Sequence, residues 1–162
     1  MTDDLSSFSK FSEAFKKFDE TKSYKELEKS LIMFDSSIVE LQSIDDVDSI
    51  ISEMNKISRR MFTYGMILES QSQVLQKVEE EFELWKSQKL VVLPKSQFSS
   101  EKSKDDYIKS TYVTEYSEFL SNIREEKYKV GLLKRAVNAL DSFSYKLHSI
   151  LSYKQKILDK TF

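Results

Sequence analysis

The sequence predicts an all-α protein, and three observations lead to that class. The 162-residue chain contains one Pro and two Gly, whereas β-sandwiches, barrels and doubly wound α/β folds need many turns rich in both. Charged residues make up 32% of the chain and apolar residues 40%, and apolar residues recur at helical spacing over most of its length. We therefore expect a long antiparallel helical hairpin, similar to a coiled coil, with two shorter helices in front of it.

The two shorter helices are expected in an N-terminal module, residues 1–44. Four phenylalanines repeat there at steps of three and four residues, which places them on one helix face: Phe8, Phe11, Phe15 and Phe18. Such a face must be covered, either by the protein's own core or by a partner. Ser23 and Glu26 have the spacing of a capping box, which predicts that a second helix starts there.

The hairpin is expected over residues 45–162, and its first helix runs from a cap at Ser43 to about Gln88. Two heptad seams follow this helix, and eleven of their twelve positions are apolar or aromatic. One seam contains Val47, Met54, Met61, Leu68, Leu75 and Phe82; the other contains Ile50, Ile57, Tyr64, Gln71, Val78 and Trp85. Gln71 is the polar exception, and it either fixes the register or occupies a tolerated rim position.

A basic hinge loop is expected at residues 89–103, because Pro94 prevents a simple continuation of the helix. Ser103 and Asp106 form a further capping-box pattern, from which the last helix should run to about Lys160.

The hairpin carries more apolar positions than one seam can cover, which predicts a homo-oligomer. The positions expected to stay uncovered include Phe62, Ile67, Val74, Tyr128, Leu132, Phe143, Ile150 and Ile157. The residues expected to support oligomerisation lie on the last helix: Leu133, Val137, Leu140, Leu147 and Leu151.

The sequence lacks the residues that several classes of function require. The absence of Cys excludes disulfides, thiolate zinc sites and cysteine nucleophiles. The two glycines, Gly65 and Gly131, are too far apart for a phosphate-binding loop, and His148 is the only histidine, so no catalytic triad stands out. The acidic group Asp45, Asp46 and Asp48 fits a helix N-terminus better than a metal site. We expect no enzymatic activity, no cofactor and no bound metal.

The sequence also predicts a cytoplasmic protein, or one of the host cytoplasm if its source is viral. The N-terminus lacks the basic and apolar regions of a signal peptide. The longest run of large apolar residues is residues 90–93, far shorter than the ~18 residues of a membrane span.

Charge is distributed unevenly, with a net charge of −8 over residues 1–85 and +6 over residues 86–162. Lysines can follow a phosphate backbone, and aromatic rings can stack on unpaired bases. One candidate DNA-binding cluster lies around the hinge and contains Lys86, Lys89, Lys95, Phe98, Lys102, Lys104 and Lys109. A second lies on the last helix and contains Arg124, Lys127, Lys129, Lys134 and Arg135. The alternative is that these cations only solubilise the surface.

Residues 55–152 resemble the phage recombination mediators of the UvsY type. The resemblance is carried by four stretches in the order of that family: residues 60–64, 85–90, 108–110 and 139–147. It implies a small, all-helical, non-enzymatic oligomer that binds single-stranded DNA and helps a recombinase to replace single-strand-binding protein.

Two other functions fit the same sequence features. A structural or adaptor coiled coil, phage-borne or regulatory, would act by protein–protein contacts without nucleic acid. A membrane-sculpting dimer of the BAR type also has long helices with basic faces, but the acidic N-terminal half and the presence of only four arginines argue against it.

Overall fold

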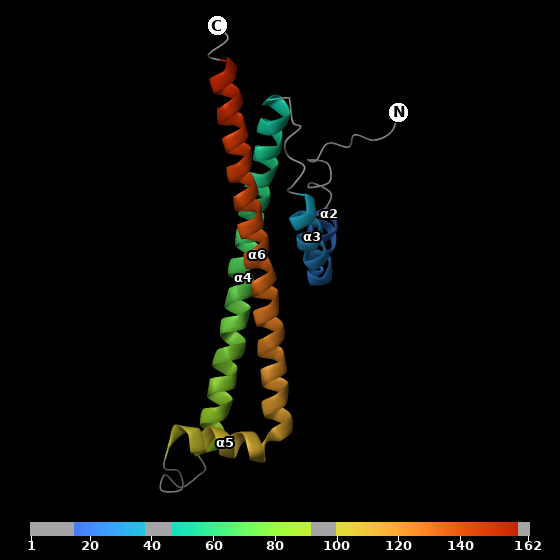
Figure 1. The fold of residues 1–162 in the computed structure, drawn as a ribbon. Coiled ribbons are helices and arrows are strands. Elements are labelled where there is room, and N and C mark those ends of the chain that lie inside the picture. The colour runs from blue at the N-terminus through green and yellow to red at the C-terminus, as the bar shows by residue number, and fades with distance from the viewer. Residues whose placement is uncertain (1–14, 38–46, 92–99, 159–162) are drawn as a thin grey trace. The chain divides into compact units, whose positions relative to one another are not determined.

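The computed structural model describes residues 15–37, 47–91 and 100–158, and 96% of these residues are helical, with none in a strand. The helices are α2 (Lys16–Thr21), α3 (Tyr24–Ser37), α4 (Val47–Val91), α5 (Glu101–Thr111) and α6 (Val113–Leu158), drawn in Figure 1. The two long helices pack against each other. The expected all-α class, with a long helical hairpin, is therefore confirmed, whereas homo-oligomerisation stays a prediction.

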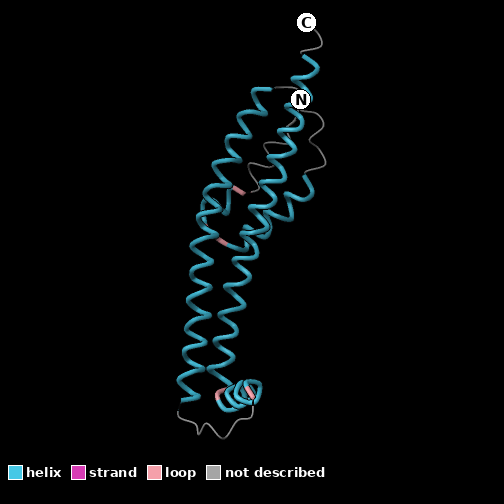
Figure 2. The backbone as a smooth tube through the Cα atoms, turned by 90° about the vertical axis from the view of Figure 1, so that its left-hand side faces the viewer, coloured by secondary structure: helices cyan, strands magenta, loops and turns pink. Residues whose placement is uncertain are grey.

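The chain divides into two compact units, and both long helices contribute to each of them. Unit 1 consists of Met1–Leu68 and Gly131–Phe162, and unit 2 of Glu69–Val130. Unit 1 therefore contains α2, α3, the first part of α4 and the last part of α6. Unit 2 contains the rest of α4, α5 and the first part of α6. Within each unit the segments of α4 and α6 lie side by side (Figure 2).

The core of unit 1 is formed by α2, α3 and the parts of α4 and α6 that the structure describes in this unit. Tyr64 of α4 is fully buried, and its ring lies 5.9 Å from that of Phe15 and 5.3 Å from that of Phe18. Phe34 of α3 lies 5.9 Å from Phe15 and meets Phe143 of α6 edge-on at 5.7 Å. Phe15 and Phe18 are thus covered by the protein's own core, while Phe8 and Phe11 lie outside the described residues.

Some apolar positions of α6 that were expected to be exposed are buried in unit 1. Leu132 and Phe143 were expected to be uncovered, yet each is only 2% exposed. The expectation was wrong because the hairpin alone would leave these positions exposed, whereas Phe34 of α3 covers Phe143. Phe62, Val74, Tyr128 and Ile157 are exposed as expected.

A partly buried polar network links α2 to α4 beside these rings. The hydroxyl of Tyr64 donates to Asp19 Oδ1 at 2.7 Å, and Arg60 donates to Asp19 Oδ2 through Nε at 3.1 Å and Nη2 at 2.8 Å. Burial, followed by the hydrogen bond to Asp19, raises the pKa of Tyr64 well above its ordinary value. The network therefore favours a neutral phenol at the contact between α2 and α4.

The heptad seams of α4 are confirmed, since all twelve positions are buried or half-buried. Ile50, Ile57 and Tyr64 are fully buried in unit 1. In unit 2, the amide of Gln71 donates to the carboxylate of Glu126 on α6. This contact favours the register-fixing interpretation of Gln71, because its polar group has a partner on the facing helix.

The last helix differs from the prediction at its start. A single helix was expected from a cap at Ser103, but Ser100 is the N-cap of α5, and Ser103 provides the reciprocal hydrogen bond of its capping box. Tyr112 then leaves helical geometry, with φ −116° and ψ 50°, so α5 and α6 are separate helices. Neither Gly nor Pro marks this break, and the side chain of Tyr112 instead joins a cluster of rings described below.

The free energy of unfolding should depend on pH above about 9 because the phenol of Tyr64 is buried. Above its ordinary pKa of about 10, an unfolded chain loses the phenolic proton that the native state retains, so the free energy of unfolding falls as pH rises. Tyr64→Phe should therefore lose less stability between pH 9 and 11 than the unmodified protein, as measured by urea unfolding. Tyr145→Phe, at a site 75% exposed, should leave the pH slope unchanged. Equal slopes for all three proteins would contradict the buried-phenol explanation.

Candidate nucleic-acid interface

The hinge cluster belongs to unit 2 as far as the structure describes it. Lys86 and Lys89 lie in the last turns of α4, and Lys102, Lys104 and Lys109 lie on α5. Lys95 and Phe98 lie outside the described residues.

Five aromatic side chains pack together where the last turns of α4 meet the start of α6: Phe82, Trp85, Tyr112, Tyr116 and Phe119. Phe82 and Trp85 are stacked, with centroids 5.9 Å apart and planes 15° apart. Phe119 lies 5.4 Å from Phe82 and 5.3 Å from Trp85, and Tyr112 meets Trp85 edge-on at 6.0 Å. Because these rings cover one another, we expect them to stabilise unit 2 rather than to receive bases.

The two hinge lysines of α4 are part of this aromatic cluster. The ammonium of Lys86 lies 4.7 Å from the ring centroid of Phe82 and 2.6 Å from Glu83. The ammonium of Lys89 lies 4.4 Å from the centroid of Tyr112 and 3.9 Å from Glu115. Both charges thus already have partners that a phosphate would have to displace.

The remaining described hinge residues differ in their pairing. Lys104 forms an ion pair with Glu101 at 2.5 Å, whereas Lys102 and Lys109 are exposed.

The hydroxyl of Tyr116 on α6 donates a hydrogen bond to Asp105 on α5 at 3.3 Å. Burial and the nearby Asp105 raise the pKa of Tyr116.

The second predicted cluster is divided between the two units. In unit 2, Lys127 pairs with Glu79 at 2.9 Å, and Lys129 pairs with both Glu125 at 2.8 Å and Glu126 at 2.7 Å. Hydrogen bonds from Lys129 to these two carboxylates raise its pKa. Arg124 of unit 2 is exposed, as are Lys134 and Arg135 of unit 1.

Lys134 and Arg135 belong to a longer exposed face of α6 that the sequence prediction missed in part. The face, here called the α6 cationic face, consists of Lys134, Arg135, Tyr145, Lys146, Tyr153 and Lys156. All six side chains are exposed, with Tyr145 at 75% and Tyr153 at 67%. Within the described ranges, no ion pair joins its four cations to a carboxylate.

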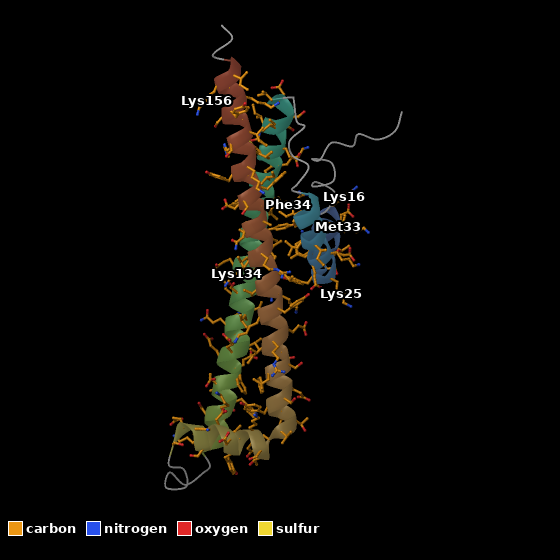
Figure 3. The ribbon with its side chains drawn as sticks, in the orientation of Figure 1. Lys16, Lys25, Met33, Phe34, Lys134 and Lys156 are labelled. Atoms are coloured by element: carbon orange, nitrogen blue, oxygen red, sulfur yellow. The ribbon has the colours of Figure 1, made fainter. Side chains whose placement is uncertain are left out.

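Helical geometry places this face opposite the buried side of α6. Lys134, Tyr145 and Lys156 are spaced by eleven residues, which is close to three turns at 3.6 residues per turn. The fully buried residues of the same segment, including Leu133, Leu140 and Leu147, fall on the other side. In Figure 3, Lys134 and Lys156 project to the same side of α6. This eleven-residue spacing is a signal in the sequence that would have revealed the face.

The local charge favours an anionic ligand. Among residues 134–156 the chain has four lysines, one arginine and a single acid, Asp141. From Lys134 to Lys156 the helix spans roughly 33 Å, at 1.5 Å per residue. The result is an array of cations and exposed phenol rings along one side of the helix, with the exposed Asp141 as its one acid.

The residues predicted to support oligomerisation lie in the core of unit 1. Leu133, Leu140 and Leu147 are fully buried, and Val137 and Leu151 are packed against the same core. Helices of the same chain therefore cover the three leucines fully and Val137 and Leu151 in part.

No protein-family model, curated protein or solved structure matches this chain. The resemblance to the UvsY type therefore stays a prediction. In the part of the chain that the structure describes, no three metal-binding side chains come together, and no helix has the length and apolar character to cross a membrane.

Neutralising the two hinge lysines of α4 should reduce the stability of unit 2. We expect the combined change Lys86→Gln and Lys89→Gln to lower the free energy of unfolding by about 1–2 kcal/mol, since one exposed cation–π contact contributes about 0.5–1 kcal/mol. Urea unfolding followed by fluorescence of Trp85, the only tryptophan, measures this effect. The control Lys102→Gln should change stability by less than about 0.5 kcal/mol. Unchanged stability in the double variant would show that the lysines do not support the cluster.

Proposed function

We propose that this protein is a non-enzymatic single-stranded-DNA-binding protein, and that the α6 cationic face is its binding surface. The observation that carries the proposal is an exposed array of tyrosines and of cations that have no ion pair among the described residues, along one side of α6 in unit 1. The hinge cluster contributes less, because Lys86 and Lys89 already interact with rings and carboxylates of unit 2.

The cations of the face suit a phosphate backbone. A lysine that is already paired must give up its carboxylate before it can bind phosphate, whereas Lys134, Lys146 and Lys156 need only exchange water and counterions. Release of counterions from the DNA then supplies much of the binding free energy and makes the affinity depend on salt.

The two exposed tyrosines favour an unpaired strand. Bases of a single strand can stack on an exposed ring, at about 1–3 kcal/mol per base, whereas bases of a duplex are already stacked. Tyr145 and Tyr153 lie among the cations, so backbone contacts and stacking can act together. We therefore expect single-stranded DNA to bind more tightly than duplex, with little sequence preference.

The resemblance to UvsY-type mediators supports a place for this binding in recombination. In that role the protein would act in the cytoplasm and help a recombinase to replace single-strand-binding protein. The proposal assigns it no catalytic step, because no nucleophile–base pair stands out in the sequence and the sequence has no phosphate-binding loop.

Binding can be tested by fluorescence anisotropy with a labelled oligothymidylate at several salt concentrations. Replacing Lys134, Lys146 and Lys156 together with Gln should weaken binding and lower the slope of log K against log salt by up to ~0.7 for each lost phosphate contact. Tyr145→Ala should weaken binding by about 1–3 kcal/mol without changing that slope, because a stacked ring carries no charge.

A matched control removes three other lysines of unit 1. Lys16, Lys17 and Lys25 are exposed on α2 and α3, so their joint replacement by Gln gives the same change in net charge at another place. This control should retain most of the affinity and the salt slope. Equal losses in both triple variants would mean that net charge alone drives binding. If the unmodified protein does not bind DNA at low salt, the structural or adaptor coiled coil becomes the better description.

A further inference from the structure

The outer side of α4 carries two large apolar side chains that the described part of the chain does not cover. Phe62 is 71% exposed and Met66 is 61% exposed. They are four residues apart, so they lie next to each other on one helix face. That face points away from Ile57 and Tyr64, which are fully buried in the core of unit 1.

A heptad pattern extends from these two residues in both directions along α4. Its members are separated by alternating steps of four and three residues, which is the spacing of a coiled-coil seam. We call this set the outer α4 seam: Asn55, Arg59, Phe62, Met66, Glu69 and Gln73. All six side chains are exposed, and all six belong to the single helix Val47–Val91.

The outer α4 seam is complementary to an antiparallel copy of itself. When two copies are paired antiparallel about the level of residue 64, Phe62 of each copy faces Met66 of the other. Two apolar layers therefore lie at the centre of the contact. At its ends the amide of Asn55 faces the amide of Gln73, so polar groups meet polar groups there.

The two charges of the seam favour the same arrangement. The antiparallel pairing places Arg59 of one copy opposite Glu69 of the other, twice by symmetry, whereas a parallel pairing would place Arg59 beside Arg59 and Glu69 beside Glu69. Within the described ranges neither residue forms an ion pair. Glu69 accepts a hydrogen bond from Gln73 of its own helix at 3.3 Å, a weak contact that an arginine can replace.

Gly65 fits a close approach of two helices at the centre of this seam. A glycine inside a helix lowers helix stability relative to alanine. Apart from its own stretch of α4 backbone, a Cβ at Gly65 would meet no atom of the described residues within 4 Å, so packing among these residues does not require glycine there. In the antiparallel pairing, Gly65 of each copy lies beside the symmetry axis, where a missing side chain lets the two backbones come close.

We propose that two copies of this chain pair through an antiparallel contact of the outer α4 seam, residues 55–73. The Phe62–Met66 layers supply the apolar burial, and the Arg59–Glu69 pairs fix the direction and the register. The contact uses α4, so it does not depend on the DNA-binding proposal, which concerns α6.

Sedimentation equilibrium of the full chain measures the pairing. We expect a concentration-dependent species of twice the 19.1 kDa mass of one chain, and at least a tenfold weaker association for Phe62→Ser. Val74→Ser, at an apolar site 42% exposed on another side of α4, is the matched control and should associate like the unmodified protein. A monomer at all concentrations up to 100 µM, or a dimer unaffected by Phe62→Ser, would overturn the proposal.

Charge reversal tests the orientation without removing apolar surface. Arg59→Glu or Glu69→Arg alone should weaken association, because each change places like charges opposite each other. The two changes in one chain should restore association. Circular dichroism checks that each variant stays helical. Failure of the double change to restore association would overturn the antiparallel arrangement.

Cysteine cross-linking gives an independent readout, because the chain contains no native Cys. An Asn55→Cys protein, labelled with ¹⁵N, is mixed with an unlabelled Gln73→Cys protein and oxidised. Mass spectrometry should find mostly mixed disulfide dimers of one labelled and one unlabelled chain. A predominance of like-with-like dimers would indicate a parallel contact and overturn the proposal.

Discussion

The burial of Tyr64 is the constraint on which the rest of unit 1 depends. Its ring lies against Phe15 and Phe18, and its hydroxyl donates to Asp19, so the ring and the hydroxyl both connect α4 to the N-terminal helices. With α2 and α3 held in this way, Phe34 can cover Phe143 of α6. The last part of α6 is then apolar on one side and polar on the other, and the α6 cationic face is that polar side.

Elements governed by local periodicity could be predicted from the sequence. The spacing of Ile50, Ile57 and Tyr64 specifies one buried face wherever the helix docks, and these residues are buried. The break at Tyr112 could not be predicted in this way, because its ring reaches Trp85, which lies on another helix. The burial of Phe143 likewise depends on Phe34, more than a hundred residues earlier in the chain.

The contrast between local spacing and contacts between helices also explains how far the candidate site could be predicted. A sequence gives the positions of cations, and it gives pairing only where the partner is one helical turn away, as for Lys129 with Glu125 and Glu126. The partners of Lys89 and Lys127 are Glu115 and Glu79, on other helices. The number of cations alone therefore favours the hinge. The positions of the carboxylates in space instead leave Lys134 and Lys156 without ion pairs among the described residues.

The α6 cationic face and the outer α4 seam differ in the force that would hold a partner, and salt separates them. At 0.1 M salt, interactions between exposed charges decay over about 10 Å, so a ligand of the α6 cationic face is released as salt rises. Contact through Phe62 and Met66 depends mainly on apolar burial, which salt does not screen; only the flanking pairs of Arg59 and Glu69 are weakened. A chain that keeps its dimeric mass at high salt while losing DNA would thus have two independent surfaces. Joint loss of both would instead mean that association is held by charge, or is itself promoted by DNA.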